Sequence, residues 1–346
     1  MENAKKAMNS IGAPRLIILS LFLVLVASAF QLKLSVSDLM SAALIRFGMN
    51  GILVLAMVPG ILSGIGLNFG IPIGIVCGLV GGLLSIQWDL RGFTAFFVAV
   101  GVSIPISLIA GWLYGQLLNR VKGSEMTVAT YAGFSVISFM SIFWLLAPFT
   151  SLEIKWPIGT GLRTTITLAG RYSKILDNFL SFKILGVTIP TGLLLFFAAA
   201  CILMKLFLKT KSGISMATAG DNPKFANASG INVDRQRIIG TMISTMCGAI
   251  GIIVYAQSYG FYQLYQAPLM MGFAAVAGIL IGGASSKRAT ITHVIIGTFL
   301  FQGLLTVSLP VANKIVTEGN LSEILRIIVQ NGIILYALTK MGGGSK

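Results

Sequence analysis

The stretch FGMNGILVLAMVPGILSGIGLNFGIPIGIVCGLVGGLLSIQW runs from Phe47 to Trp88 without an Asp, Glu, Lys or Arg residue. A charged side chain at the centre of a bilayer costs roughly 2.5 to 3.5 kcal/mol on insertion scales, so uncharged apolar runs indicate membrane spans. This run is about twice the roughly 20 residues that cross a bilayer once. It therefore predicts two membrane helices that fold back on each other.

The rest of the chain has the same character, because its 346 residues are 55% hydrophobic and only 10% charged. Soluble domains carry about 25% charged residues, so a soluble protein is excluded. Seven further uncharged stretches are Leu16 to Leu32, Gly92 to Asn119, Met126 to Leu152, Ile184 to Met204, Ile238 to Ser286, Ala289 to Asn313 and Ile327 to Thr339. The stretch Ile238 to Ser286 is again long enough for two helices. The sequence predicts an all-α polytopic membrane protein of about ten transmembrane helices, formed by residues 1–346 as a single domain.

The basic residues indicate how the chain is oriented in the membrane. The net charge is +15, but Lys and Arg lie between the apolar spans rather than in one patch, which argues against nucleic-acid binding. With ten spans and a cytoplasmic amino terminus, 15 of the 25 basic residues fall on the inner side. We expect both termini to be cytoplasmic, in the cell (inner or plasma) membrane. The stretch Leu16 to Leu32 could be a cleaved signal peptide, but an uncleaved first span is expected because the apolar run continues past Ala27-Ser28-Ala29.

The longest outer connection comprises residues 148–186. It is predicted to be either a lid or a docking surface, in which case Arg163, Arg171 and Lys174 would contact a partner protein. The alternative is a solvated loop whose run Tyr172 to Phe182 forms an interfacial helix, anchored by Trp156 and Tyr172.

Glycines within the opening stretch recur at intervals of four, at Gly66, Gly70, Gly74, Gly78 and Gly82. Such spacing predicts one helix ridge that lets backbones approach closely. Pro59, Gly60, Ser63 and Gly64 precede the ridge and would bend or break the helix before it. Irregular backbone at membrane depth is tolerated only where it is buried or lines a cavity, so residues 63–71 are a candidate site, and Asn68 is the one that packing explains least.

A second informative region is the inner connection, residues 209–237. Asn222 is a suitable N-cap, Pro223 suits the first helical position and Gly230 suits a left-handed stop, which together predict a short helix from Pro223 to Ser229. Its exposed face would present Lys224, Phe225 and Ala228 to a groove on a partner.

The string Gly220-Asp221-Asn222-Pro223, followed by Ala226 and by Gly230-Ile231-Asn232-Val233, resembles the cytoplasmic coupling segment of ABC importer permeases. The branch that it resembles contains ribose, other sugar, nucleoside and branched-chain amino-acid permeases. Ser37 to Gly74 is similar to the second and third spans of that family, and Ala274 to Gly283 is similar to its segment that ends in a glycine pair. Two departures, at Leu67-Asn68-Phe69 and at Lys287-Arg288, leave the solute open.

This resemblance implies a permease fold with a cytoplasmic coupling helix and a separate ABC ATPase that uses ATP and Mg. The chain itself would bind no cofactor, and it contains no P-loop motif. An extracytoplasmic solute-binding protein, a second permease subunit in a homo- or heterodimer, and membrane lipid are the other implied partners. The residues expected to couple to the ATPase are Gly220, Asp221, Asn222, Pro223, Lys224, Phe225, Ala226 and Gly230.

The uncharged spans predict a pathway for a neutral polar solute, such as a ribose-like monosaccharide or a nucleoside. Candidates for solute contact are Ser63, Asn68, Gln257, Tyr259, Phe261, Tyr262 and Gln302, although the aromatic ones could instead form an interfacial belt. The chief alternative is an ion-coupled secondary transporter or a channel. A secondary transporter would normally bury a carboxylate, although sodium can be bound by carbonyl oxygens alone. One His and three scattered Cys supply neither a catalytic set nor a metal site, so an enzyme is not expected.

Overall fold

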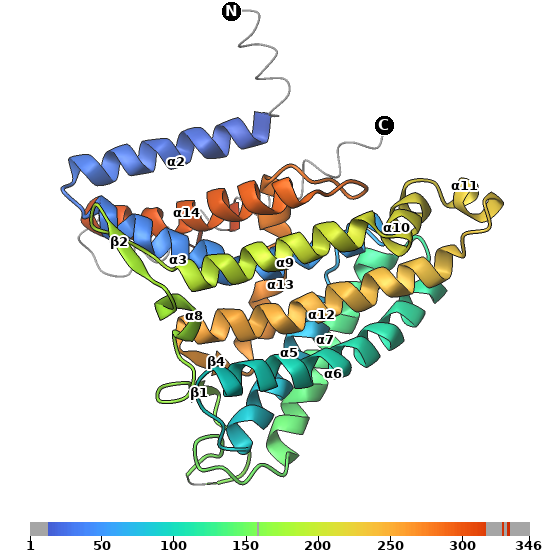
Figure 1. Cartoon of the computed structure of the whole chain (residues 1–346), viewed down its shortest axis with the longest axis horizontal. Coiled ribbons are helices and arrows are strands. Elements are labelled where there is room, and N and C mark those ends of the chain that lie inside the picture. The colour runs from blue at the N-terminus through green and yellow to red at the C-terminus, as the bar shows by residue number, and fades with distance from the viewer. Residues whose placement is uncertain (1–12, 158, 316–326, 329–330, 333–346) are drawn as a thin grey trace, which may run out of the picture.

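The structure, a computed structural model, describes residues 13–157, 159–315, 327–328 and 331–332. Within these residues six helical segments are long and apolar enough to cross a membrane, and three shorter apolar helices accompany them (Figure 1). The apolar helices are α2 (Ala13–Gln31), α3 (Val36–Leu55) with α4 (Met57–Leu62), α5 (Ile71–Gln87), α6 (Gly92–Arg120), α7 (Glu125–Leu146), α9 (Thr191–Lys209), α12 (Val233–Tyr259), α13 (Gln266–Ile281) and α14 (Ile291–Ile315). The predicted span Ile327 to Thr339 lies largely outside the described residues, so the count of ten stays a prediction.

Both doubled stretches fold back as predicted. The first divides into α3–α4 and α5, and the second divides into α12 and α13, with Gly260 in the left-handed conformation at the end of α12 (φ 96°). The helices extend beyond the uncharged stretches, however. Helix α3 begins at Val36, where the Ser35 side chain accepts a hydrogen bond from the Asp38 amide, so this span also carries Arg46.

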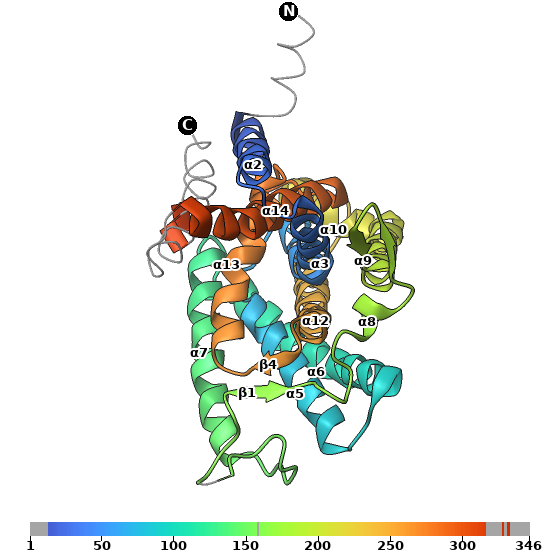
Figure 2. The same cartoon turned by 90° about the vertical axis from the view of Figure 1, so that its left-hand side faces the viewer.

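Helix α12 is the centre of the bundle, packed against α3, α5 and α6 (Figure 2). A Cβ atom on Gly74 or Gly78 of α5 would collide with the Thr245 or Ala249 carbonyl oxygen of α12, so the two backbones are in direct contact. The prediction of one helical ridge is wrong for Gly66 and Gly70, because both precede α5. Gly66 has a φ of 89°, which takes it out of the helical region.

One end of the bundle, here called the α8 end, carries all the strands. Strand β1 (Thr165–Thr167) pairs antiparallel with β4 (Phe261–Gln263), and β2 (Phe182–Ile184) forms a hairpin with β3 (Val187–Ile189). The long connection thus folds down onto the helices. The predicted interfacial helix over Tyr172 to Phe182 is wrong, because only α8 (Ile175–Asn178) is helical, and Tyr172 is buried rather than an interfacial anchor.

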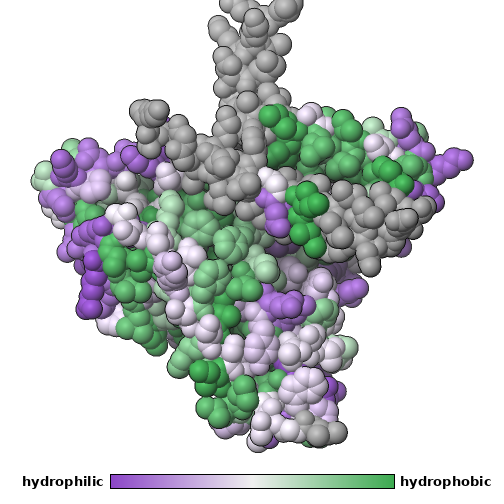
Figure 3. Space-filling model, turned by 180° about the vertical axis from the view of Figure 1, so that it is seen from behind, coloured by the Kyte–Doolittle hydropathy of each residue, from purple (hydrophilic) through white to green (hydrophobic). Residues whose placement is uncertain are grey.

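The opposite end, here called the α11 end, carries α10 (Lys211–Asp221) and α11 (Pro223–Ala228). Helix α11 matches the predicted short helix within a residue, because Ser229 is its C-cap. Helix α10 was not predicted. Seen from behind, hydrophilic side chains gather toward the two ends of the molecule, whereas hydrophobic ones predominate between them (Figure 3), as a bilayer-spanning bundle requires.

Candidate functional site

The short helix α11 is capped at both ends and presents all its side chains except that of Ala226 to solvent. The Asn222 side chain accepts a hydrogen bond from the Phe225 amide at 3.1 Å, and Gly230 closes the helix with a φ of 76°. Ala226 is fully buried in a small cluster with Ala219 and Val233. Phe225 is 59% exposed, so an apolar ring projects from a helix that is otherwise anchored to the bundle.

Helix α10, which precedes α11, directly contacts the irregular segment between α4 and α5. This segment comprises residues 63–70 and is here called the α4–α5 break. A Cβ atom on Gly220 of α10 would collide with the Leu62 carbonyl, and one on Gly64 would lie 2.9 Å from the Gly220 Cα atom. On the other side of the break, Gly240 of α12 leaves room for the Ser63 side chain. Helix α10 therefore contacts the α4–α5 break through backbone atoms, with no side chain between them.

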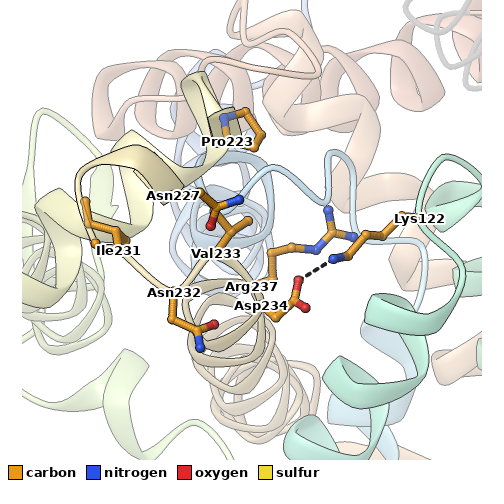
Figure 4. Close-up of a pocket in the computed structure, with 9 residues that line it drawn as sticks. Lys122, Pro223, Asn227, Ile231, Asn232, Val233, Asp234 and Arg237 are labelled. Atoms are coloured by element: carbon orange, nitrogen blue, oxygen red, sulfur yellow. Dashed lines mark ion pairs between the residues drawn. The ribbon is translucent and has the colours of Figure 1, made fainter. Parts of the chain in front are cut away.

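A pocket of about 560 Å³ lies between α11, the start of α12 and the α6–α7 turn (Figure 4). Its lining residues are Lys122, Pro223, Asn227, Gly230, Ile231, Asn232, Val233, Asp234 and Arg237. Lys122 forms an ion pair with Asp234. The buried Arg237 donates to Glu125 at 2.6 Å and to Asn119 at 2.9 Å, which ties the first turns of α12 to α6 and α7.

Asn68 forms the polar centre of the α4–α5 break. Its Oδ1 atom accepts hydrogen bonds from the Tyr114 hydroxyl at 2.9 Å and the Gly70 amide at 3.0 Å. Its Nδ2 atom donates to the Ser244 hydroxyl at 2.7 Å, and Ser244 donates to the Ala56 carbonyl. Asn68 is buried, so these bonds explain its presence by holding irregular backbone in place. Ser63 is likewise buried and donates to the Gly60 carbonyl.

The seven residues predicted to contact solute do not form one site. Ser63 and Asn68 lie at the α4–α5 break, whereas Gln257 and Tyr262 are fully buried at the α8 end, and Gln302 is buried in α14. Tyr259 and Phe261 are partly exposed and pack together with ring centroids 4.7 Å apart. Sequence reasoning missed Arg46, which lies inside α3, because it assumed that charges flank the spans.

The three basic residues predicted for partner docking differ in their surroundings. Arg171 is buried, and its guanidinium donates to both oxygens of Glu153, at 2.7 and 3.0 Å, and to Asp89 at 2.9 Å. The hydrogen bonds from Arg171 lower the pKa of the Glu153 carboxyl. These bonds occupy the guanidinium of Arg171 in joining the long connection to the α5–α6 turn, so they do not favour the predicted contact of Arg171 with a partner protein. Arg163 is partly buried, and Lys174 is exposed.

Helix α7 has an unusual exposed face. Thr127, Tyr131, Ser135 and Ser138 follow one another along it, and Tyr131 is 69% exposed. The exposed faces of α6 and α9 at comparable depth are apolar, with residues such as Ile109 and Ile202. Hydroxyl groups have few hydrogen-bond partners in hydrocarbon. The same face of α7 also carries Phe134 and Ile142, of which Ile142 is 60% exposed, so this helix mixes hydroxyl groups with apolar side chains on its outer surface.

The comparison with family models identifies the chain. Residues 10–338 match the model described as the permease component of the branched-chain amino acid transport system. The chain belongs to this family. The permease is thus a multi-pass membrane protein of the ABC importer permease family, as the coupling-segment resemblance had predicted.

Individual relatives differ in the solute that their names state. The permease is 31% identical over 54% of its length to a tyrosine transport system permease protein of Clostridioides difficile, and 23% identical over 68% to the nucleoside permease protein NupB of Lactococcus lactis. It is 25% identical over 68% to the galactose/methyl galactoside import permease protein MglC of Haemophilus influenzae.

These alignments span 66%, 63% and 66% of the respective relatives. No solved structure matches the permease. The relatives therefore place the chain among sugar, nucleoside and amino-acid permeases without selecting one solute.

Proposed function

We propose that the permease forms the translocation path of an ABC importer for a small neutral polar solute, a monosaccharide or a nucleoside. A separate cytoplasmic ATPase, using ATP and Mg, would supply the energy, and an extracytoplasmic binding protein would deliver the solute. The observation that carries this proposal is the α11 segment, with Phe225 exposed on a helix whose Ala226 is buried. We therefore propose that the α11 end faces the cytoplasm, and with the predicted ten spans both termini would be cytoplasmic as well.

The contacts around Gly220 suggest how the ATPase would act. A partner that binds α11 and moves it would move α10 as well, because the two helices are separated only by Asn222. Helix α10 is in close backbone contact with the α4–α5 break at Gly220 and Gly64, so a movement of α10 would be transmitted to the break. The ATPase shifts the permease between inward- and outward-open states only if it binds those states with different affinity.

The test is to replace Pro223 and Phe225 by Asp and to measure solute-stimulated ATP hydrolysis in the assembled transporter. We expect stimulation to be lost while the permease remains folded, because a charged side chain cannot enter an apolar groove without a large desolvation cost. Phe182→Asp replaces a similarly exposed aromatic at the α8 end, and it is the matched control for folding and for assembly with the ATPase. Normal stimulation in the Pro223/Phe225 variant would refute the coupling role.

We further infer that the exposed face of α7 borders the pathway, with a second permease subunit on the opposite side. The support is the row of hydroxyl groups, which suits water and a hydroxyl-bearing solute better than lipid. A membrane-impermeant thiol reagent should label Tyr131→Cys and Ser138→Cys, and solute should slow the labelling. Ile202→Cys on α9 is the control and should stay unlabelled. The three native cysteines are buried, so they interfere little. If all three variants resist labelling by the thiol reagent equally, the exposed face of α7 contacts lipid rather than the pathway.

A further inference from the structure

A buried carboxyl group fastens the long connection to the end of α12. Asp177 of α8 is only 6% exposed. Its Oδ1 atom accepts hydrogen bonds from the Ser258 hydroxyl at 2.7 Å and from Gln257 Nε2 at 3.0 Å. The Gln257 side chain also accepts from the Leu176 amide, and its backbone carbonyl accepts from the Lys174 amide. Together these bonds close α8 over the last turn of α12.

The surroundings of Asp177 disfavour a negative charge. Its Oδ2 atom is buried and accepts no hydrogen bond from the described residues. The last turn of α12 presents the partly negative carbonyl end of a 27-residue helix. An ionised carboxylate buried here loses free energy of hydration that its hydrogen bonds do not fully restore. A neutral carboxylic acid loses far less free energy of hydration on burial.

Few charged groups act on this carboxyl. Helix α8 packs against α9 and α12. The charged residues of those two helices are Lys205, Lys209, Asp234, Arg235 and Arg237, and all of them lie toward the α11 end. Near Asp177, the residue that precedes α8 contributes one charged group, Lys174. Lys174 is exposed, so solvent screens its charge.

We propose that Asp177 is a proton-binding site that latches the long connection over α12, holding it when protonated and loosening it when ionised. Burial raises the pKa of the Asp177 carboxyl, and the hydrogen bonds from Ser258 and Gln257 only partly oppose this. A carboxyl with a raised folded-state pKa stabilises the closed form fully below its ordinary pKa. That contribution is lost as the pH rises through the raised value. The latch would therefore respond to the pH of the outer compartment.

The proposal does not depend on transport, so it is tested on the purified full-length chain in lipid nanodiscs. Hydrogen exchange of residues 172–180 and 255–260 is followed from about pH 5 to about pH 8, with correction for the intrinsic rates. Opening should rise by up to about tenfold for each pH unit between the ordinary pKa of an aspartate and the raised pKa, and it should level off above the raised pKa. Asp177→Asn, which stays neutral, should abolish this rise. Infrared spectra of the wild type should contain a protonated-carboxyl band that the variant lacks.

Two further variants keep the test decisive. Ser258→Ala removes a donor that favours the carboxylate, so the rise in opening should continue to higher pH before it levels off. This variant serves if Asp177→Asn does not fold. Glu153→Gln alters an acid whose pKa is lowered, and it should leave the rise unchanged. The proposal is overturned if the wild type and Asp177→Asn show the same pH dependence, or if their infrared spectra do not differ in the carboxyl band.

Discussion

At the scale of the residue, the buried bonds of Asn68 account for the conformation of the α4–α5 break. Asn68→Leu would leave the Tyr114 hydroxyl and the Gly70 amide without their acceptor. Each unsatisfied buried group costs about 1 to 3 kcal/mol, so we expect a large drop in the thermal unfolding temperature in detergent. Gln302→Leu is the control, because the side chain of this buried residue forms no hydrogen bond with the described residues, so its loss should cost little. An equal drop in both variants would show that the Asn68 bonds have no special role.

Residues whose role depends on a distant partner were the hardest to predict. Arg171 was grouped with Arg163 and Lys174 because all three are basic and occupy one connection. Its partner Asp89 is 82 positions away in the chain, so no local pattern indicates that the pair forms a buried contact. Asp177 was not singled out for the same reason, because its partners Gln257 and Ser258 lie 80 and 81 positions away in the chain.

At the scale of the element, the contact between α10 and the α4–α5 break makes Gly220 a sensitive position. The side chain in Gly220→Val would collide with the Leu62 carbonyl, and overpacking of this kind costs about 1 to 3 kcal/mol. We expect α10 to move away from the break, so that the ATPase still binds but solute no longer stimulates hydrolysis. Co-purification and ATPase assays measure the two effects separately. Gly101→Val adds a side chain to α6 in open space and should change neither. Full stimulation of ATP hydrolysis by solute in Gly220→Val would show that the contact between α10 and the α4–α5 break is not needed for coupling.

Elements defined by local cues were predicted well, and elements defined by long-range pairing were not. The sequence from Asn222 to Gly230 contains its own N-cap, helix-favouring proline and left-handed stop, so α11 was predicted within a residue. Strand β1 pairs with β4 almost 100 positions later, and each strand has only three residues, which is too short for an alternating pattern to stand out. Helix α10 was missed because it is rich in small polar residues rather than apolar ones.

At the scale of the whole molecule, hydropathy alone predicted the membrane class and both helical hairpins, because the cost of placing charge in a bilayer applies to any sequence. The family followed from the motif around Pro223. The predicted solute-contact residues were chosen for their polarity, and most of them turned out to be buried. A polar side chain in a membrane helix stabilises the bundle as readily as it binds a solute, so polarity could not distinguish these roles.

The most direct test of the account is solute uptake into vesicles that contain the permease with or without its ATPase. The account predicts uptake only when the ATPase, ATP, Mg and the binding protein are all present, and no uptake when a proton or sodium gradient is imposed on the permease alone. Uptake by the permease alone, driven by an ion gradient, would contradict it.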